Sequence, residues 1–337
     1  MQAFIVGSGT ALPERVVSNE DIAGRLGLDP DQIFKSSGIK RRRWAEPGTT
    51  TSSLASTALE LALTDANLSG QEIDYLIFGT MTPDRFIPGS APSVQQKLGL
   101  AEIPCLDVRA ACCNALYALQ LASSLIVSGT ARRVAICLAE VQSAWLDLSP
   151  EAGTTSMLFG DGASAIVVSN EYRDSALQIV DVLLATNGSY VDDLGIRCPG
   201  TEFGVFASEV SAGQRGDCFP RMVGQSVILQ ASRKMSAACQ SILQRNDLNI
   251  SDVRWIVPHQ ANANLLNQVA RSLRFERGAE GLVSVLEDQG NTSSASMGLA
   301  LDSLRRSNRI QAGDLLLMPA FGAGFSWGAA LCRASKQ

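Results

Sequence analysis

The sequence predicts an α/β protein built from two similar halves, which we assign to residues 1–170 and 171–337. Short apolar stretches typical of buried strands alternate with longer stretches whose apolar residues recur at helical spacing. The pattern repeats after a shift of about 180 positions. The matching apolar positions are Leu63, Leu68 and Ile73 in the first half and Leu243, Leu248 and Val253 in the second. Such a duplication predicts two α/β units packed about a pseudo-two-fold axis.

The first half reads as an ordered series of strands and helices. Almost continuous apolar residues predict its strands, at residues 3–9, 73–78, 134–138 and 165–168. Helical spacing, capping residues and terminal glycines predict its helices, at residues 18–27, 52–66, 88–98 and 112–128.

The second half repeats this order. We expect a helix over residues 236–247, a strand over 253–257 and a further strand near 314–318. Residues 187–223 show no regular periodicity and contain several glycines, which predicts a long excursion over one face. Loops of that length are uncommon unless they serve a function.

Composition excludes several classes of protein. The chain has 337 residues, of which 46% are hydrophobic and 18% charged, so it can bury a large core. A net charge of −5 argues against a nucleic-acid-binding surface, and we interpret the basic run at residues 40–43 as a solvated edge. No apolar stretch approaches the roughly 20 residues of a membrane-spanning helix, and the N-terminus lacks a basic leader.

Cysteine and histidine usage indicates a reduced protein without a metal. The eight cysteines form no C-x-x-C pair and lie mostly in apolar segments. This pattern favours free thiols in a cytoplasm over disulfides or zinc ligands. The chain has one histidine, which excludes a histidine-rich metal site.

Cys112 is the first candidate for chemistry. An apolar strand ends near Val108, and Cys112 then opens a helical pattern. Unpaired backbone N–H groups and the helix dipole at such a start favour the thiolate, which is the nucleophilic form of cysteine. The alternative is a thiol packed in the core, which the remaining candidates argue against.

His259 and Asn291 complete a predicted site. The duplication places Thr292 opposite Cys112, and Asn291 directly precedes Thr292, so symmetry brings Cys112 and Asn291 together. His259 follows the predicted strand over residues 253–257, and ligands of α/β sheets gather at the carboxyl ends of strands. We therefore expect the three side chains to share one pocket.

The motifs around these residues resemble the β-ketoacyl-acyl carrier protein synthase III family. They are AAC at residues 110–112, PHQAN at 258–262, GNTS at 290–293 and AFGAGFSWG at 320–328, with SGI at 37–39 and FGDGA at 159–163. The resemblance covers nearly the whole chain. It implies a thiolase-like α/β fold, in which two βαβαβαββ halves form a five-layer α-β-α-β-α sandwich.

The resemblance implies an acyltransferase that needs no cofactor. Its reaction is the decarboxylative condensation of an acyl thioester with malonyl-acyl carrier protein, giving a 3-oxoacyl product in fatty-acid or specialised-metabolite synthesis. Cys112 would carry the acyl group, and backbone N–H groups of Cys112 and Ala323 would form the oxyanion hole. His259 and Asn291 would stabilise the enolate left by decarboxylation.

The resemblance also implies partners and substrate contacts. Expected partners are an acyl carrier protein, acyl-CoA or another acyl thioester, and a second copy of the chain in a homodimer. Ile87 would reach into the acyl tunnel of the second copy. The substrate-binding residues implied by the family are Ile87, Phe159, Asn262, Phe321, Gly322 and Gly324.

Several positions depart from the family pattern. Cys113 and Asn114 stand where the family usually has small residues, and Ala323 replaces a glycine. The positions that hold coenzyme A in well-known bacterial members carry Gln32 and Ser36, and Asn264 replaces an arginine associated with carrier-protein docking. These departures predict a specialised synthase whose acyl donor differs from acetyl-CoA.

Two alternatives remain open on the sequence alone. One is a non-decarboxylating acyl-CoA condensing or acyl-transfer enzyme of the same fold, which would use Cys112 without a malonyl thioester. The other is a catalytically silent dimer partner, which would be expected to lose part of the cysteine, histidine and asparagine set.

Overall fold

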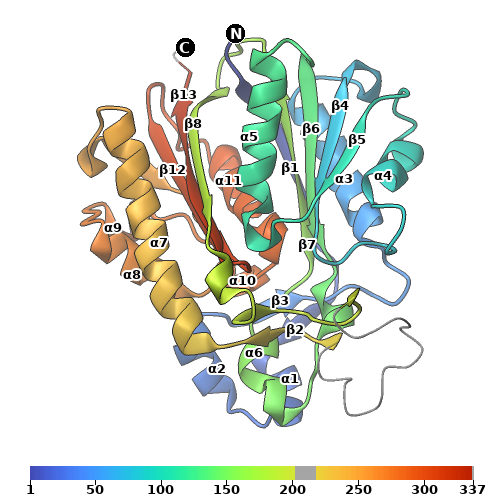
Figure 1. Ribbon diagram of the computed structural model, residues 1–337, viewed down its shortest axis with the longest axis vertical. Coiled ribbons are helices and arrows are strands. Elements are labelled where there is room, and N and C mark those ends of the chain that lie inside the picture. The colour runs from blue at the N-terminus through green and yellow to red at the C-terminus, as the bar shows by residue number, and fades with distance from the viewer. Residues whose placement is uncertain (202–217, 336–337) are drawn as a thin grey trace.

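The computed structural model describes residues 1–201 and 218–335 (Figure 1). Among these residues, nine strands form one continuous sheet in the order β11-β12-β13-β8-β1-β7-β6-β4-β5. The two ends of this sheet come from different parts of the chain, which allows two similar units to share one scaffold.

The strands fall into an N-terminal and a C-terminal set. The N-terminal strands are β1 (Phe4–Ala11), β4 (Tyr75–Gly79), β5 (Cys105–Val108), β6 (Arg133–Glu140) and β7 (Gly162–Ser169). The C-terminal strands are β8 (Leu177–Thr186), β11 (Val253–Ile256), β12 (Leu315–Gly322) and β13 (Ser326–Ala334). The sets join where Phe4 and Ile5 of β1 pair antiparallel with Gln178 and Leu177 of β8.

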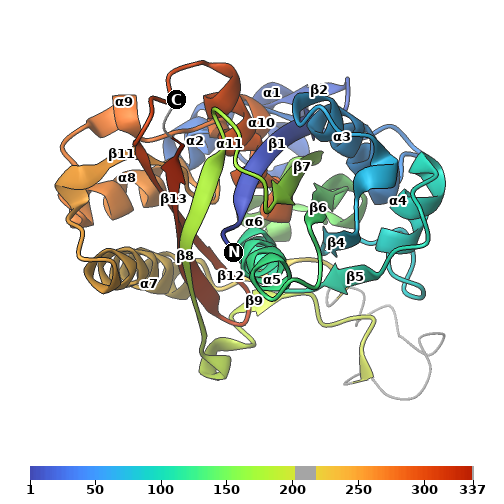
Figure 2. The same ribbon diagram turned by 90° about the horizontal axis from the view of Figure 1, so that it is seen from above.

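Helices form three layers around these strands (Figures 1 and 2). The outer helices over the N-terminal strands are α3 (Thr51–Asp65) and α4 (Ala91–Leu98). Those over the C-terminal strands are α7 (Gly224–Arg245) and α8 (Ala263–Ser272). Between the strand sets lie α5 (Asn114–Val127) and α11 (Ser296–Arg306), which share one apolar core with Ile136 of β6 and Met318 of β12. This is the predicted five-layer α-β-α-β-α sandwich.

Shorter elements cover one end of the sandwich, seen at the bottom of Figure 1. They are β2 (Val16–Ser18), α1 (Asn19–Leu26), α2 (Pro30–Ser37), β3 (Arg41–Arg43), α6 (Gly153–Ser156) and α10 (Leu286–Gln289). The short α9 (Gly278–Gly281) follows α8, and β9 (Leu194–Gly195) pairs with β10 (Arg221–Met222). The interpretation of the basic run as solvated is wrong for Arg42, which is buried and donates to the Met157 carbonyl at 2.8 Å.

The order of elements repeats along the chain and corrects the predicted alignment. The 3-10 turn Ala111–Cys113 precedes α5, and the 3-10 turn Ser293–Ala295 precedes α11. Ala111 and Ser293 both have positive φ, 50° and 47°. Cys112 therefore matches Ser294 and not Thr292, because the connection that leads to this turn is longer after β11 than after β4. The predicted boundary between the two halves, near residue 170, stays a prediction. It falls in the connection between the end of β7 and the start of β8.

Three predicted helix starts differ from the structure. The helix predicted from residue 88 begins at Ala91, where the Asp107 carboxylate accepts hydrogen bonds from the backbone N–H groups of Ser90 and Ala91. The helix predicted from residue 236 begins at Gly224, because buried Ala231 and Met235 extend its apolar face. The helix predicted from Cys112 begins at Asn114, after the 3-10 turn. The predicted excursion over residues 187–223 lies partly outside the described residues.

Two features are absent from the described part of the chain. None of its helices combines the length and the apolar character that crossing a membrane requires. Within residues 1–201 and 218–335, no group of three histidine, cysteine or acidic residues is placed to hold a metal ion.

Candidate active site

Cys112 lies in a turn that is pinned from several sides. The Asn114 carboxamide oxygen accepts a hydrogen bond from the Ala110 backbone N–H at 2.6 Å. The neighbouring Cys113 thiol is buried and donates to the Ser326 carbonyl on β13 at 3.2 Å. The half-buried Cys112 side chain lies between these held residues and contacts the Ser293 hydroxyl in the 3-10 turn before α11.

Gly322 brings the end of β12 against this turn. A Cβ atom at Gly322 would lie 2.9 Å from the backbone N of Cys112, closer than side chains allow. The next two residues, Ala323 and Gly324, are half-buried, and Gly324 has a φ of 132° that favours glycine. The predicted oxyanion residues Cys112 and Ala323 therefore belong to two adjoining pieces of backbone.

His259 is held at the end of β11. Its backbone N–H donates to the Pro319 carbonyl of β12 at 2.9 Å, and its side chain is 2% exposed. Nδ1 of the imidazole lies 2.6 Å from the Ser296 hydroxyl. Burial lowers the pKa of His259 to about 4, whereas a hydrogen bond with the Ser293 backbone raises it. The imidazole is therefore neutral at pH 7.

Asn291 is fixed through its backbone and its side chain. Its backbone N–H donates to the Leu158 carbonyl at 2.8 Å, and its carbonyl accepts from the Gly160 N–H at 3.0 Å. Its carboxamide oxygen accepts a hydrogen bond from the Ser293 backbone N–H at 2.9 Å. This contact leaves the carboxamide NH2 as the group that can donate to a ligand.

The three predicted catalytic residues converge on Ser293. Its hydroxyl lies 3.5 Å from the sulfur of Cys112, and its N–H binds the side chain of Asn291. Its backbone is also close enough to the imidazole of His259 to raise the pKa of that ring. A thiol, a neutral imidazole and a carboxamide thus surround one residue.

Known proteins resemble the chain along nearly its whole length. Residues 106–188 match the family description 3-Oxoacyl-[acyl-carrier-protein (ACP)] synthase III, and residues 243–334 match its C-terminal counterpart. The β-ketoacyl-[acyl-carrier-protein] synthase III of Bordetella petrii is 39% identical over 337 residues, covering 98% of each chain.

Solved structures agree with the sequence matches. The 3-oxoacyl-[acyl-carrier-protein] synthase III of Aquifex aeolicus superposes with a TM-score of 0.88 at 33% identity, over 98% of this chain and 99% of that one. The priming β-ketosynthase of a polyketide biosynthetic pathway gives a TM-score of 0.87 at 30% identity, over 100% and 97% of the two chains.

The chain belongs to the 3-oxoacyl-acyl carrier protein synthase III family. These matches confirm the predicted family and the thiolase-like α/β fold. They also confirm an acyltransferase that carries out the β-ketoacyl-acyl carrier protein synthase III condensation of fatty-acid synthesis.

The prediction of an activated Cys112 thiolate is wrong for the synthase without substrate. Burial raises the pKa of Cys112 to about 11, and the negative charge of Glu140 adds to the rise. Hydrogen bonds from Ser293 and from the Cys112 backbone act in the opposite direction but are outweighed. The neutral His259 supplies no positive charge to offset the loss of solvent.

Glu140 is a site residue of this synthase that sequence reasoning missed. This buried carboxylate at the end of β6 accepts hydrogen bonds from the hydroxyls of Thr82 at 2.8 Å and Ser294 at 2.6 Å. The backbone N–H of Met81 also donates to it, at 3.0 Å. Glu140 ends β6, and Ser294 lies in the 3-10 turn that follows Asn291. Their hydrogen bond therefore joins the N-terminal strands to this turn.

The departures at Cys113 and Asn114 have structural explanations in this family member. Gly79 ends β4 directly against Asn114, and a Cβ atom at Gly79 would lie 2.7 Å from the Asn114 Cβ. Gly79 thus leaves room for the larger side chain that pins Ala110. The Cys113 thiol is fully buried and donates to the Ser326 carbonyl, so this second thiol is not open to a substrate.

The residues that the family assigns to substrate binding occupy different settings. Phe159 is buried and bridges to Asn291, and Phe321 is buried beside Phe325 with ring centroids 4.7 Å apart. Ile87 is 78% exposed and lies away from the enclosed core. Gly322 and Gly324 flank Ala323 in the turn described above.

The side chains of Asn262 and Asn264 join α8 to α2 by hydrogen bonds. The Asn262 carboxamide caps α8 by accepting from the N–H groups of Asn264 and Leu265, and it donates to the Ser36 carbonyl at 2.8 Å. The Asn264 carboxamide also donates to the Ser36 carbonyl, at 3.0 Å. Asn264, one of the departures from the expected family pattern, thus binds the backbone of α2.

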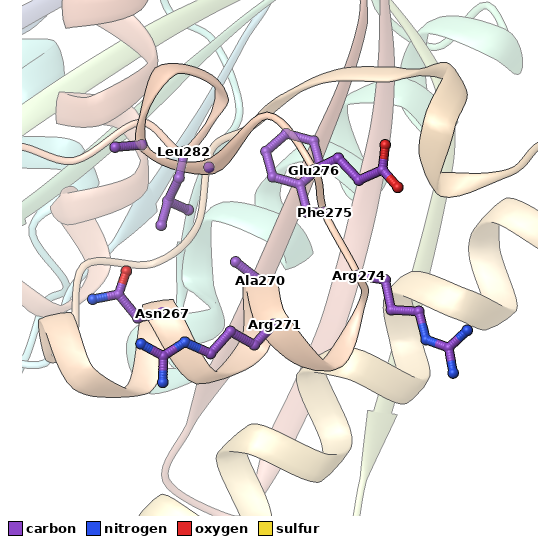
Figure 3. A pocket seen from close by; sticks show the side chains of 9 residues that line it. Asn267, Ala270, Arg271, Arg274, Phe275, Glu276 and Leu282 are labelled. Atoms are coloured by element: carbon purple, nitrogen blue, oxygen red, sulfur yellow. The ribbon is translucent and has the colours of Figure 1, made fainter.

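A shallow hollow of about 360 Å³ between α8 and α9 is separate from these residues (Figure 3). Its lining includes Arg271, Arg274 and Phe275 and contains none of Cys112, His259 and Asn291. The synthase chemistry therefore does not belong to this hollow.

Proposed function

We propose that this chain makes a 3-oxoacyl thioester by decarboxylative condensation, with Cys112, His259 and Asn291 as its catalytic residues. The convergence of these three side chains on Ser293 carries the proposal. A nucleophile beside two neutral hydrogen-bond donors suits a reaction that passes through an acyl-enzyme and then an enolate.

In the first stage, the sulfur of Cys112 attacks the carbonyl carbon of an acyl thioester. The new carbon–sulfur bond forms as the bond to the leaving thiol breaks, and the proton lost by Cys112 passes to that leaving thiolate. Backbone N–H groups of Cys112 and Ala323 stabilise the oxyanion. Because the Cys112 pKa is about 11, the side chain is a protonated thiol before the thioester binds.

In the second stage, a malonyl thioester loses CO2, and the electron pair moves to the thioester oxygen as an enolate. His259 and the Asn291 carboxamide donate hydrogen bonds to this oxygen. The enolate carbon then attacks the acyl carbon on Cys112, and the Cys112 sulfur leaves and takes up a proton. Neither donor has to transfer a proton, which suits an imidazole whose pKa is about 4.

We extend the proposal to the partners. The second substrate is malonyl-acyl carrier protein, and the names of the relatives, β-ketoacyl-[acyl-carrier-protein] synthase III, support the carrier protein. The acyl donor is an acyl-CoA or another acyl thioester, and the departures at Gln32, Ser36 and Asn264 support a specialised donor. Cys112 and Cys113 are both thiols, which supports a reducing cytoplasm.

We propose a homodimer that forms through the edge of the sheet at β5. This edge strand lies at the end of the strand order and carries Leu106, which is 37% exposed. The nearby loop presents Phe86 and Ile87, which are 75% and 78% exposed. An unpaired strand edge beside exposed apolar side chains is suited to pairing with a second copy.

The nucleophile is tested with a radiolabelled acyl thioester. We expect covalent label on the wild type, none on Cys112→Ala, and wild-type label on the control Cys113→Ala. Intact-mass analysis with a panel of acyl thioesters then identifies the donor. Label that persists on Cys112→Ala contradicts the proposal. An acylated wild type that releases no CO2 from labelled malonyl thioester instead supports the non-decarboxylating alternative.

A further inference from the structure

We propose that Ser296 is a positioning residue that selects the tautomer of His259. In this tautomer Nδ1 accepts a hydrogen bond from the Ser296 hydroxyl, and Nε2–H is the donor presented to the substrate. The inference deepens the proposed function and rests on it for the role of the donor. Its starting observation is the 2.6 Å contact between Nδ1 and the Ser296 hydroxyl oxygen.

The second partner of Ser296 decides the direction of this hydrogen bond. The backbone N–H of Gln260 donates to the Ser296 hydroxyl oxygen at 3.1 Å. A hydroxyl has one hydrogen to donate, and a backbone N–H can only donate. With Gln260 as donor, the Ser296 hydrogen is left for Nδ1. The reverse arrangement would leave that hydrogen unpaired at a position that is 1% exposed.

The backbone N–H of Gln260 is held in place, because hydrogen bonds fix the Gln260 side chain at both carboxamide atoms. Gln260 is fully buried, and its carboxamide nitrogen donates to the carbonyls of Pro258 at 2.8 Å and Val283 at 3.2 Å. Its carboxamide oxygen accepts from the Val285 N–H at 3.0 Å. The segment that carries His259 is thereby tied to the loop that follows α9.

The Ser296 hydroxyl does not cap a helix or make another structural hydrogen bond among the described residues. Ser296 is the first residue of α11, and the cap position before it is Ala295, which offers no side-chain hydrogen bond. Among the described residues, the hydroxyl has hydrogen-bond partners in His259 and Gln260 and in no other group. The pKa of His259, about 4, keeps the imidazole neutral, so a single tautomer can persist across the working pH range.

The chain has one histidine, which makes the tautomer directly measurable. Protein prepared without a histidine tag and labelled with ring-15N histidine gives NMR signals from His259 alone. At pH 7 we expect a protonated Nε2 and an unprotonated Nδ1 in the wild type. A protonated Nδ1 in the wild type overturns the inference.

The Ser296→Ala variant tests the cause. We expect its His259 signals to lose the Nε2–H preference and malonyl decarboxylation to fall on the order of 10- to 100-fold, as for other orienting hydrogen bonds. Acylation of Cys112 should stay close to wild type. The matched control is Ser303→Ala, an exposed serine on the same helix, which should change neither readout.

The outcomes separate the two proposals. A folded Ser296→Ala protein that keeps both the Nε2–H tautomer and decarboxylation contradicts the role of Ser296. If the variant does not fold, the tautomer of the wild type still decides the direction of the hydrogen bond. A wild type with the expected tautomer but no decarboxylation contradicts the proposed function and leaves the tautomer assignment standing.

Discussion

His259 shows how a buried position changes the chemistry of one side chain. An exposed histidine titrates near pH 6.5, and the enclosed imidazole of His259 titrates near pH 4 because the charged form has lost its solvent. The ring can therefore donate a hydrogen bond without carrying a charge. The same enclosure has a measurable effect on the stability of the fold.

The stability of the protein should fall with acidification partly because of His259. Its pKa is about 4 in the folded chain and 6.5 in the unfolded chain, so between these values the unfolded chain binds the extra proton. The free energy of unfolding then decreases as pH falls from about 6.5 to 4, by up to roughly 3 kcal/mol. Urea denaturation of wild type and His259→Gln across this range measures the difference.

Carboxylates also titrate in this range, but they do so in both proteins, and the comparison removes their contribution. Equal pH slopes for wild type and His259→Gln would contradict the lowered pKa.

At the scale of elements, the site depends on how closely β12 approaches the 3-10 turn Ala111–Cys113. Gly322 permits this approach because it has no side chain to meet the Cys112 backbone. On the opposite flank, Gly79 leaves room for Asn114, which pins the start of the turn. The nucleophile is thus positioned by contacts between a turn and the ends of two strands.

Gly322→Ala should damage acylation more than folding. The added Cβ would lie 2.9 Å from the Cys112 nitrogen, so the turn that carries the sulfur and the oxyanion N–H must move. We expect the rate of Cys112 acylation to fall at least about tenfold, because misplaced catalytic groups lose rate steeply. Single-turnover acylation measures the effect.

The matched control is Gly188→Ala, where an added Cβ meets nothing within 4 Å and both acylation and melting temperature should stay unchanged. Wild-type acylation by Gly322→Ala would show that the turn has room that the structure does not display.

At the scale of the whole molecule, Glu140 connects parts of the chain that lie far apart in sequence. It takes hydrogen bonds from the loop after β4 and from the turn before α11. Burial raises its pKa, and these hydrogen bonds lower it. Its negative charge also raises the pKa of Cys112, and the neutral His259 supplies no positive charge to offset it.

Glu140→Gln should make Cys112 more reactive at a given pH. Removing the negative charge removes one of the causes that raise the Cys112 pKa, so the pH profile of alkylation should move to lower pH. Iodoacetamide labelling with peptide mapping measures the profile. Glu60→Gln, on the exposed side of α3, should leave it unchanged. A profile that stays in place in the folded Glu140→Gln protein would rule out the electrostatic effect.

The proposed dimer makes a prediction at the same scale. Leu106→Asp places a charge on the exposed edge strand β5 and should shift the protein from dimer to monomer in sedimentation velocity. Leu61→Asp adds the same charge on α3, where the leucine is 43% exposed, and should leave the dimer intact. A wild type that sediments as a monomer at all concentrations would contradict the proposal.

The sequence was sufficient for residues whose position follows from a local pattern. Cys112 follows a predicted strand and opens a helical stretch, and His259 follows the predicted strand over residues 253–257. The hydrophobic periodicity and the duplication therefore indicate the positions of both residues. Ser293, Ser296 and Glu140 carry no such signal, because their roles depend on contacts with residues 181, 37 and 154 positions away in the chain, respectively. The Cys112 pKa was misjudged because the extent of burial is a property of the packed molecule.

The left-handed backbone of Ala111 and Ser293 has a consequence for engineering. For residues with a Cβ, this conformation costs roughly 1 kcal/mol each, and glycine would adopt it without that cost. A search for heat-resistant variants would therefore select glycine at these two places, one beside the sulfur and one at the meeting point of the catalytic groups. Glycine would also loosen the two turns, so gains in melting temperature there should be accompanied by losses in turnover.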